Sequence, residues 1–296
     1  GTFKLTNDIS VTTMVGTESL PFSGTFDGQG HTLNVNIESG DEYTAPFHWA
    51  VNSTFKNLKV EGTITVTEHF AGGLIGWAED VTLQGCESKV TINSDYGGDG
   101  THGGFISIVR GGTARFYDCV FSGAIIGENT DCCGGFCGWH DGWVQIYNCL
   151  NIGRFELASS YSCSTFSRNG VEAYNSYYIS SFASVVQDNQ GTSVTTEQLA
   201  DGSITRMLQD GSRDWTTGQV WGQLIGTDAV PLLTSDTSKG VYKVSFAVDG
   251  QVVKSIFSNS PLGDKMPTGE DFGLTNATFT YNGSTFTGTT PFTSDI

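Results

Sequence analysis

The sequence predicts an all-β fold, a parallel β-helix in which short strands wind repeatedly around one elongated core. Composition is the first observation behind this prediction: of 296 residues only 15% are charged, 39 are glycine, and serine, threonine and asparagine are abundant. Such a composition favours short strands and turns over long amphipathic helices. The second observation is an internal repeat of about 30 residues, a period that is typical of solenoid proteins.

The repeat can be followed through five segments, which begin at Ala45, Gly72, Gly103, Gly134 and Ser164. Most start with Gly-Gly and an apolar residue, pass through a polar turn, and continue as two short strands. Alignment gives one column of Phe47, Leu74, Phe105, Phe136 and Phe166, and another of Asn57, Cys86, Cys119, Cys149 and Ser176. Equivalent residues of successive coils stack about 4.8 Å apart in a parallel β-helix, so we expect each column to form a ladder inside the core.

The stretch DCCGGFCGWHDGW, residues 131–143, has the composition of a metal or redox site. A structural zinc site needs four Cys or His ligands, and no CxxC pair with a matching distant pair is present. The repeat favours packed thiols instead, and Cys133 aligns with Cys163 of the next coil, so that a disulfide or a thiol stack would explain both. The chain has seven cysteines, which leaves at least one thiol unpaired in an exported protein.

After the coils, residues 192–211 predict a helix. Thr195 and Gln198 form a capping-box pattern, and Leu199, Ile204 and Leu208 supply an apolar side. A solenoid must cover its open end to prevent edge pairing, so we expect this helix to act as a short cap. We therefore predict two domains: residues 1–235 as the capped β-helix, and residues 236–296 as a small β module with hairpin turns at Asp249-Gly250 and Asn282-Gly283.

Charge and hydropathy exclude several partners. The net charge is −17, from 14 Lys and Arg against 31 Asp and Glu, which disfavours binding to nucleic acid and to anionic lipid. No apolar run approaches the roughly 20 residues of a membrane helix, so we expect no membrane insertion within this sequence. The chain opens at GTFKL without a charged-then-apolar leader, and we expect a mature or trimmed form.

Part of the sequence resembles a known family. The stretch FSGTFDGQGHTLNVNI at 22–37, followed by GGLIGW and strand ends in GC, DC and NC, is similar to the GLUG-motif repeats of bacterial cell-surface proteins over about residues 1–235. This resemblance implies a right-handed, pectate-lyase-like β-helix at the bacterial surface or secreted. The C-terminal segment, with VYKVSFAVDGQVVKSIF, resembles small β-grasp-like repeats of the Listeria–Bacteroides type, which implies a spacer or adhesion role.

One line of side chains suggests catalysis. Glu79, Arg110 and Asp141 lie at the same offset in three successive coils. Two carboxylates separated by two coils would be roughly 9.6 Å apart, near the upper limit for an inverting glycosidase. The alternative is an exposed acid, base, acid ladder, which stabilises the fold only slightly and performs no chemistry.

Acidic loops suggest a calcium site. The loops at 93–104 and 127–133 contain Asp95, Asp99 and Asp131, whose oxygens suit calcium, although the Asp-x-Asp-x-Asp-Gly pattern is absent. We expect no other cofactor. His102 and His140 occur one per loop, and we expect both to face solvent as turn residues rather than to bind metal.

Aromatic residues are the candidates for ligand binding. Trp77 and Trp139 share a column two coils apart, Trp143 follows four residues later, and Tyr96 lies in the longest loop. Exposed rings of this kind can stack on sugar rings, whereas buried rings would only pack the corner of each coil. The sequence therefore predicts an exported adhesin or binding module for glycans or host surface proteins, with a carbohydrate-active enzyme or a passive stalk as alternatives.

Overall fold

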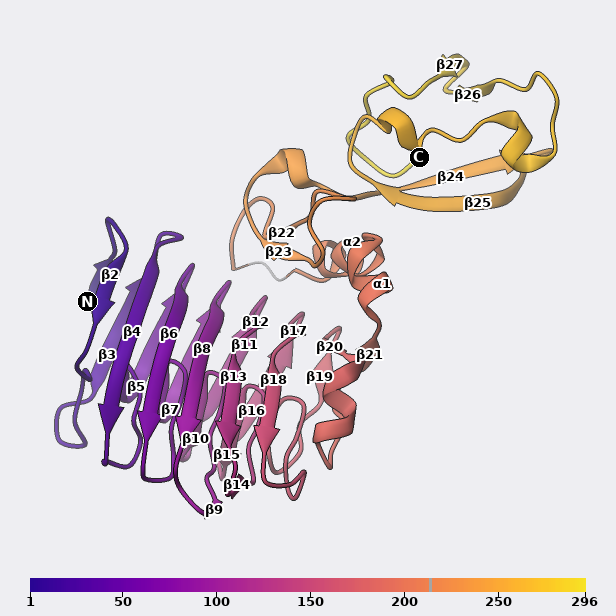
Figure 1. Ribbon diagram of the computed structural model, residues 1–296. Helices are drawn as coiled ribbons and strands as arrows, with labels where there is room; N and C mark the ends of the chain where they lie inside the picture. The colour runs from indigo at the N-terminus through magenta and orange to yellow at the C-terminus, as the bar shows by residue number, and fades with distance from the viewer. Residues whose placement is uncertain (213–214) are drawn as a thin grey trace. The chain divides into compact units, whose positions relative to one another are not determined.

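The computed structural model describes residues 1–212 and 215–296 and divides the chain into two compact units. The first unit comprises Gly1–Val194 with Ser212–Thr216, and the second comprises Thr195–Gly211 with Thr217–Ile296. The first unit is a parallel β-solenoid of about six turns (Figure 1), which confirms the predicted all-β class and β-helix architecture. The domain boundary at residue 235 stays a prediction.

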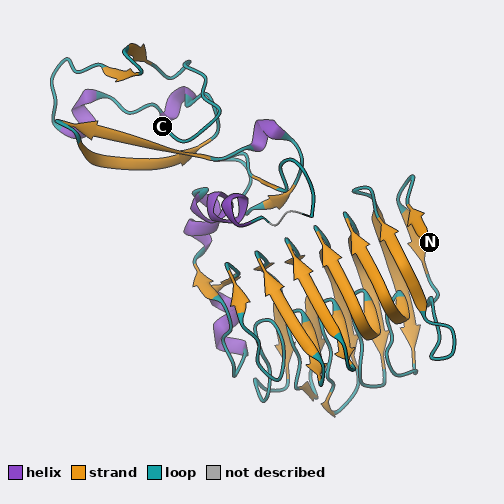
Figure 2. Ribbon diagram, turned by 180° about the vertical axis from the view of Figure 1, so that it is seen from behind, coloured by secondary structure: helices purple, strands orange, loops and turns teal. Residues whose placement is uncertain are grey.

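Two long parallel sheets form the walls of the solenoid, and their strands stack coil upon coil (Figure 2). The first sheet contains β1 (Thr2–Lys4), β3 (Phe22–Asp27), β5 (Phe47–Lys56), β7 (Ile75–Gln84), β10 (Ile106–Val109), β11 (Thr113–Tyr117), β15 (Cys137–His140), β16 (Trp143–Tyr147) and β19 (Ala173–Tyr174). The second contains β2 (Ile9–Val11), β4 (Thr32–Ser39), β6 (Lys59–Val66), β8 (Glu87–Ser94), β12 (Val120–Phe121), β13 (Ala124–Gly127), β17 (Leu150–Asn151), β18 (Arg154–Leu157), β20 (Tyr177–Ile179) and β21 (Thr192–Val194). A short pair, β9 (Gly98–Asp99) and β14 (Thr130–Asp131), joins two loops.

The register of the ladders builds the core. In the first sheet Phe55 pairs with Leu83, and Leu83 pairs with Phe116, and all three side chains are fully buried. Successive side chains of a strand point to opposite faces, so the alternation in each strand sends one set inward and the other to solvent. The predicted column of Leu74, Phe105, Phe136 and Phe166 is confirmed: the backbone bonds connect these residues in order, and the ring centroids of Phe136 and Phe166 lie 4.9 Å apart.

The predicted alignment was wrong by one residue in the earliest coil. Phe47 pairs with Ile75, and because Lys59 pairs with Glu87, Leu58 rather than Asn57 precedes Cys86 in its column. Asn57 belongs to the neighbouring column of turn residues with positive φ, which is completed by Gly85, Asp118, Asn148 and Asn175. Each of these residues turns the chain from the first sheet into the second. Asn and Asp tolerate this left-handed conformation better than other non-glycine residues, which explains the choice of side chains.

The last coil omits the first sheet. Asp188 of the last coil forms a bridge with Ser164 of the preceding coil, and β21 pairs with β20. In the preceding coil, residues 165–176 connect these two positions and include β19. In the last coil, only residues 189–191 connect them. Gly191 makes this short connection possible, because its φ is +78° and a Cβ would lie 2.7 Å from the Ser176 carbonyl oxygen and 2.9 Å from the Phe166 ring. The short 3-10 helix η1 (Ser180–Val185) covers the other side of this coil, where Phe182 packs on Phe155.

Gln190 replaces part of the missing strand. In three earlier coils a phenylalanine carbonyl, that of Phe105, Phe136 or Phe166, accepts two N–H groups from the coil before; the carbonyl of Phe166, for example, accepts from Phe136 and Cys137. The N–H groups of Phe166 and Ser167 instead donate to Oε1 of Gln190, at 3.2 and 2.7 Å. The Gln190 side chain is buried, and its Nε2 donates to the Ser167 carbonyl at 2.7 Å. A side-chain amide thus performs the hydrogen bonding of a backbone peptide unit.

The second unit is small and mixed. It contains α1 (Thr196–Ala200), α2 (Ser203–Gly211), β22 (Trp221–Gly222), β23 (Leu232–Leu233), β24 (Tyr242–Val248), β25 (Gln251–Ser258), β26 (Phe279–Tyr281) and β27 (Ser284–Phe286), with 3-10 turns at Thr237–Lys239, Gly263–Lys265 and Gly269–Phe272. The predicted capping box is confirmed. The single predicted helix is wrong, because Asp201 and Gly202 divide it and Gly202 has a φ of +87°.

Both predicted hairpin turns of the second unit are confirmed, since Asp249-Gly250 and Asn282-Gly283 have positive φ throughout and connect antiparallel pairs. Its core is formed by Val244, Phe246, Leu262, Phe286 and Phe292. Among the described residues of the whole chain, no helix has the length and apolar character to cross a membrane. The cap role of the helices and the β-grasp resemblance stay predictions.

The Gln190 cap can be tested by stability. Gln190→Ala leaves the buried N–H groups of Phe166 and Ser167 without an acceptor, and each such loss costs about 1–3 kcal/mol. We expect the free energy of unfolding, measured by urea titration, to fall by about 2–4 kcal/mol. Asn189→Ala, at the exposed neighbouring position, should change it by less than about 0.5 kcal/mol. Equal effects of the two substitutions would show that the amide does not cap the sheet.

Candidate functional site

The line of Glu79, Arg110 and Asp141 exists in the structure. Arg110 N donates to the Ala78 carbonyl at 2.9 Å and Asp141 N to the Val109 carbonyl at 3.1 Å, which places the three residues at one offset in successive coils. Arg110 forms an ion pair with Asp141 at 3.0 Å. The backbone N–H of Gly111 first, and then Arg110, hold the pKa of Asp141 below its usual value. A general acid needs the opposite, a carboxyl that keeps its proton near neutral pH.

Aromatic rings gather around the predicted Trp77. Trp49 pairs with it in register, and the two rings stack with centroids 6.3 Å apart. Tyr43, from the loop before β5, contacts Trp49 at 4.9 Å and stacks on Phe70 at 5.1 Å. His69 stacks on Phe70 at 3.7 Å and reaches Tyr96 at 5.1 Å, so that one continuous surface joins the loops to the sheet. We call Tyr43, Trp49, His69, Phe70, Trp77 and Tyr96 the aromatic array.

Every ring of the array is partly exposed, between the buried and the fully exposed extremes. The sequence left open whether the Trp77 ring is buried in the corner of a coil or exposed to solvent. The structure shows that it is partly exposed. Burial raises the pKa of Tyr43, whose hydroxyl stays neutral and can donate or accept a hydrogen bond. Tyr43, Trp49, His69 and Phe70 were missed at the sequence level, because the coil that contains Trp49 lacks the Gly-Gly start of the later coils and was aligned one residue out of register with the coil of Trp77.

The other predicted aromatic residues lie outside the array. Trp139 lies two coils from Trp77, and the intervening Ile108 pairs with both. The Arg110 guanidinium lies 4.8 Å from the centre of the Trp139 ring, so Arg110 contacts both a predicted binding residue and the carboxylate of Asp141. Trp143 begins β16 and is 76% exposed.

The acidic loops are organised by an arginine. Asp99 and Asp131 are partners in the β9–β14 pair, while Asp95 is exposed in the preceding turn. Arg168 donates to Asp99 at 2.6 Å. Although burial acts to raise it, the pKa of Asp99 is lowered by hydrogen bonds from Arg168 and Thr101. Among the described residues, no group of three or more His, Cys, Asp or Glu side chains is placed to hold a metal ion.

His102 does not face solvent, contrary to our expectation. Its side chain is fully buried, its Nδ1 accepts from Ala71 N at 3.0 Å, and its Nε2 lies 2.8 Å from Ser94 Oγ. Because Nδ1 accepts a backbone N–H, the proton resides on Nε2 and is donated to Ser94. Burial lowers the pKa of His102 to about 3, so the ring is neutral at physiological pH. His140 is half-buried and contacts the Gly142 and Gly170 carbonyls.

Five of the seven cysteines form two ladders of free thiols, Cys86–Cys119–Cys149 and Cys133–Cys163. All seven are buried and unpaired, and Cys133 and Cys163 stack without a disulfide. Cys119 N donates to Cys149 Sγ at 3.4 Å, Cys149 N to Ser176 Oγ at 3.0 Å, and Cys133 N to Cys163 Sγ at 3.4 Å. In both ladders a side-chain sulfur or oxygen atom accepts a backbone N–H that the turn leaves without a carbonyl partner. Burial raises the pKa of Cys132 and of Cys137 to about 12 and also raises those of Cys86, Cys119 and Cys133.

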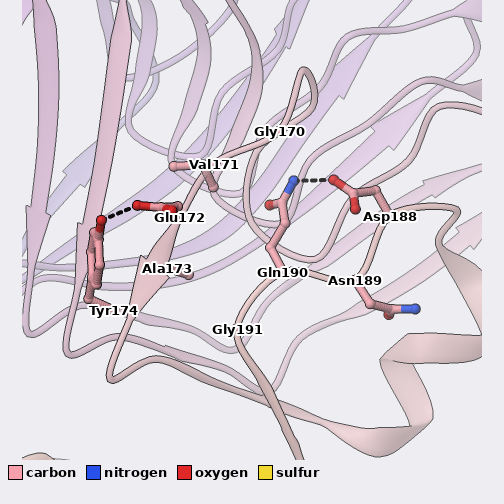
Figure 3. A pocket seen from close by; sticks show the side chains of 9 residues that line it. All are labelled: Gly170, Val171, Glu172, Ala173, Tyr174, Asp188, Asn189, Gln190 and Gly191. Carbon is pink, nitrogen blue, oxygen red and sulfur yellow. Dashed lines mark hydrogen bonds between the residues drawn. The ribbon is translucent and has the colours of Figure 1, made fainter.

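A groove lies at the C-terminal end of the first sheet (Figure 3). Its volume is about 760 Å³, and it is lined by Gly170, Val171, Glu172, Ala173, Tyr174, Asp188, Asn189, Gln190 and Gly191. Tyr174 donates to Glu172 on one side, and on the other Gln190 donates to Asp188 at 2.6 Å. The Tyr174 ring also ends a stack with Tyr147 and Tyr117, at centroid distances of 5.2 and 5.5 Å. No sequence pattern had marked this groove.

Comparisons with known proteins leave the activity open. No model of a known protein family and no curated protein sequence matches this chain. One solved structure, described as a "putative immunoglobulin A1 protease" from Bacteroides ovatus, is similar to this chain. The similarity covers 79% of this chain and 86% of that chain, with 15% sequence identity and a TM-score of 0.49. We draw no functional conclusion from a similarity of this size. The resemblance to GLUG-motif proteins stays a prediction.

The buried His102 predicts a pH-dependent stability. Its pKa is about 3 in the folded chain and 6.5 in the unfolded chain, so the unfolded chain binds more protons between these values. The free energy of unfolding should therefore be fully retained above pH 6.5 and decrease as the pH falls toward 3. Urea titrations at several pH values should show a smaller slope below pH 6.5 for His102→Gln than for the parent. Parallel pH curves for the two proteins would contradict a buried neutral imidazole.

The thiol ladders predict chemical inertness. A thiol reacts as its thiolate, and buried thiols with raised pKa values hold their protons. A thiol-specific reagent such as Ellman's reagent should therefore label the native protein very slowly and label all seven cysteines after denaturation without reductant. Fewer than seven labelled thiols in the denatured, unreduced protein would reveal a disulfide and contradict the ladders.

Proposed function

We propose that this protein is an exported bacterial surface protein that binds neutral glycans through the aromatic array. The observation that carries this proposal is the continuity of six partly exposed rings across two coils and their loops. Flat apolar rings offer their faces to the C–H surfaces of sugars, and neighbouring polar groups then fix the orientation of the ligand. A solenoid holds such rings rigidly, so little conformational entropy is lost on binding.

Polar groups suited to sugar hydroxyls surround the array. His69 contacts Glu42 at 2.7 Å, and His48 lies against the Trp49 ring at 4.4 Å. Outside the array, the half-exposed Arg110 and Asp141 add a donor and an acceptor beside Trp139. The net charge of −17 opposes anionic polysaccharides, so we expect neutral or amino sugars as ligands. Host surface proteins would be recognised here through such glycans.

The proposal predicts a specific loss of binding. Trp77→Ala removes the ring that continues the array from the loops onto β7, and we expect the affinity for a neutral polysaccharide to fall at least about tenfold, equivalent to about 1.4 kcal/mol. Trp77→Phe, which keeps an aromatic face, should retain most of the affinity. Tyr281→Ala serves as the control, because Tyr281 is a 39% exposed ring in the second unit.

Retention on immobilised mucin and plant polysaccharides, followed by calorimetry on the best ligand, measures these affinities, and circular dichroism verifies that each variant is folded. Failure of the parent protein to bind any of the glycans would favour a passive stalk and contradict the proposal. Undiminished glycan binding by Trp77→Ala would show that the binding site lies outside the aromatic array. Release of oligosaccharides, lost in Glu79→Gln or Asp141→Asn, would instead establish a carbohydrate-active enzyme.

A further inference from the structure

The groove beside β19 is the place of an absent strand. Gly72, Gly103, Gly134, Ser164 and Asp188 occupy equivalent positions in successive coils. After each of the first four, the chain supplies a strand to the first sheet before it reaches the second sheet. After Asp188, the three residues 189–191 pass directly to β21. Consequently β19 pairs with β16 on one side, and no other strand of the described residues pairs with it. The groove of about 760 Å³ occupies the opposite side.

Backbone groups on that side point into the groove. The Tyr174 carbonyl accepts from Asn148 N at 2.9 Å, so the backbone of Tyr174 is directed toward β16. Neighbouring residues of a strand alternate in the direction of their N–H and C=O groups. The backbone groups of Ala173 are therefore directed away from β16. Unpaired edge groups of this kind are a template for another extended chain.

The cap formed by Gln190 stops short of this edge. Its side-chain amide satisfies Phe166 and Ser167, which lie before β19 in the chain. Most natural edges are protected by charge, proline or a covering segment. Residues 170–174 contain one charged residue, Glu172, between small or apolar residues that leave room for a neighbouring backbone. The paired strand itself is short, because β19 comprises only Ala173 and Tyr174.

Charge determines which peptide would fit. Two carboxylates, those of Glu172 and Asp188, line the groove, both residues are exposed, and none of the nine lining residues is basic. We propose that the groove binds an extended basic peptide segment, which adds to β19 as a further strand while its lysine or arginine side chains contact Glu172 and Asp188. Backbone hydrogen bonds to Ala173 hold the segment, and the carboxylates select its charge. This site is separate from the aromatic array and requires no glycan binding.

A matched set of synthetic peptides tests the proposal. The probe is a fluorescent, blocked peptide of alternating lysine and valine, compared with the same peptide with glutamate in place of lysine and with the lysine peptide N-methylated at every residue. Fluorescence anisotropy with the full chain should show saturable binding of the lysine peptide and at least tenfold weaker binding of the other two. The methylated peptide keeps the charge but cannot donate strand hydrogen bonds, so it separates strand addition from electrostatic attraction to an acidic protein.

Variants of the chain locate the site. Glu172→Gln and Asp188→Asn should each weaken the lysine peptide several-fold, whereas Glu61→Gln, an exposed carboxylate on β6, should not. Ala173→Pro removes the N–H that points into the groove, and proline is tolerated at such an edge position, so stability should be retained while binding is lost. If this variant does not fold, protection of the Ala173 amide from hydrogen exchange on addition of the lysine peptide provides the same information.

Three results would overturn the proposal. Equal binding of the methylated and unmethylated lysine peptides would reduce the interaction to nonspecific charge. Equal effects of Glu172→Gln and Glu61→Gln would place it elsewhere on the acidic surface. Concentration-dependent self-association in sedimentation experiments, abolished by Ala173→Pro, would assign the edge to a second copy of this chain rather than to a basic peptide.

Discussion

The parallel, in-register stacking of coils is the constraint on which the structure depends. Each backbone peptide unit of one coil bonds to its equivalent in the next, as in the ladder from Phe55 through Leu83 to Phe116. A side chain is therefore surrounded by its own equivalents, about 4.8 Å away along the axis. Buried aromatic rings, small thiols and turn asparagines can form such ladders at little cost, whereas like charges cannot. The same constraint converts a sequence repeat into a spatial column and makes neighbours of residues about 30 positions apart.

Departures from strict stacking create the two candidate sites. The aromatic array forms where the loops before β5, β7 and β10 differ in length, so that Tyr43, His69 and Tyr96 lie over the sheet instead of repeating one another. The groove forms where the last coil omits the first sheet and a single glutamine amide replaces a strand carbonyl. Regular coils supply rigidity, and irregular segments supply the surfaces that a ligand could contact, as is usual for loops on a rigid scaffold.

Much of the scaffold could be predicted from the sequence, and less of the sites. The repeat predicted the solenoid, the column from Leu74 to Phe166 and the structural nature of the cysteines. These predictions were possible because residues at equivalent positions of the repeat stack on one another in successive coils. The segment that begins at Ala45 was misaligned at Phe47 and Asn57, because it lacks the Gly-Gly start on which the later segments were aligned, although its strands pair with those of the next coil at a constant offset. His102 was expected in solvent, since a histidine in a glycine-rich loop gives no sign of the Ser94 hydroxyl and the Ala71 N–H that enclose it. The groove was not predicted, because it arises from a segment that the last coil does not contain.

An open edge at β19 distinguishes this structure from a fully capped solenoid. Residue-resolved hydrogen exchange of the free protein tests this edge without any ligand. We expect strong protection of the Tyr174 amide, on the side that pairs with β16, and fast exchange of the Ala173 amide, on the side of the groove. Protection of Ala173 equal to that of Tyr174 would show that another segment already pairs with this edge, and the edge would then not be open.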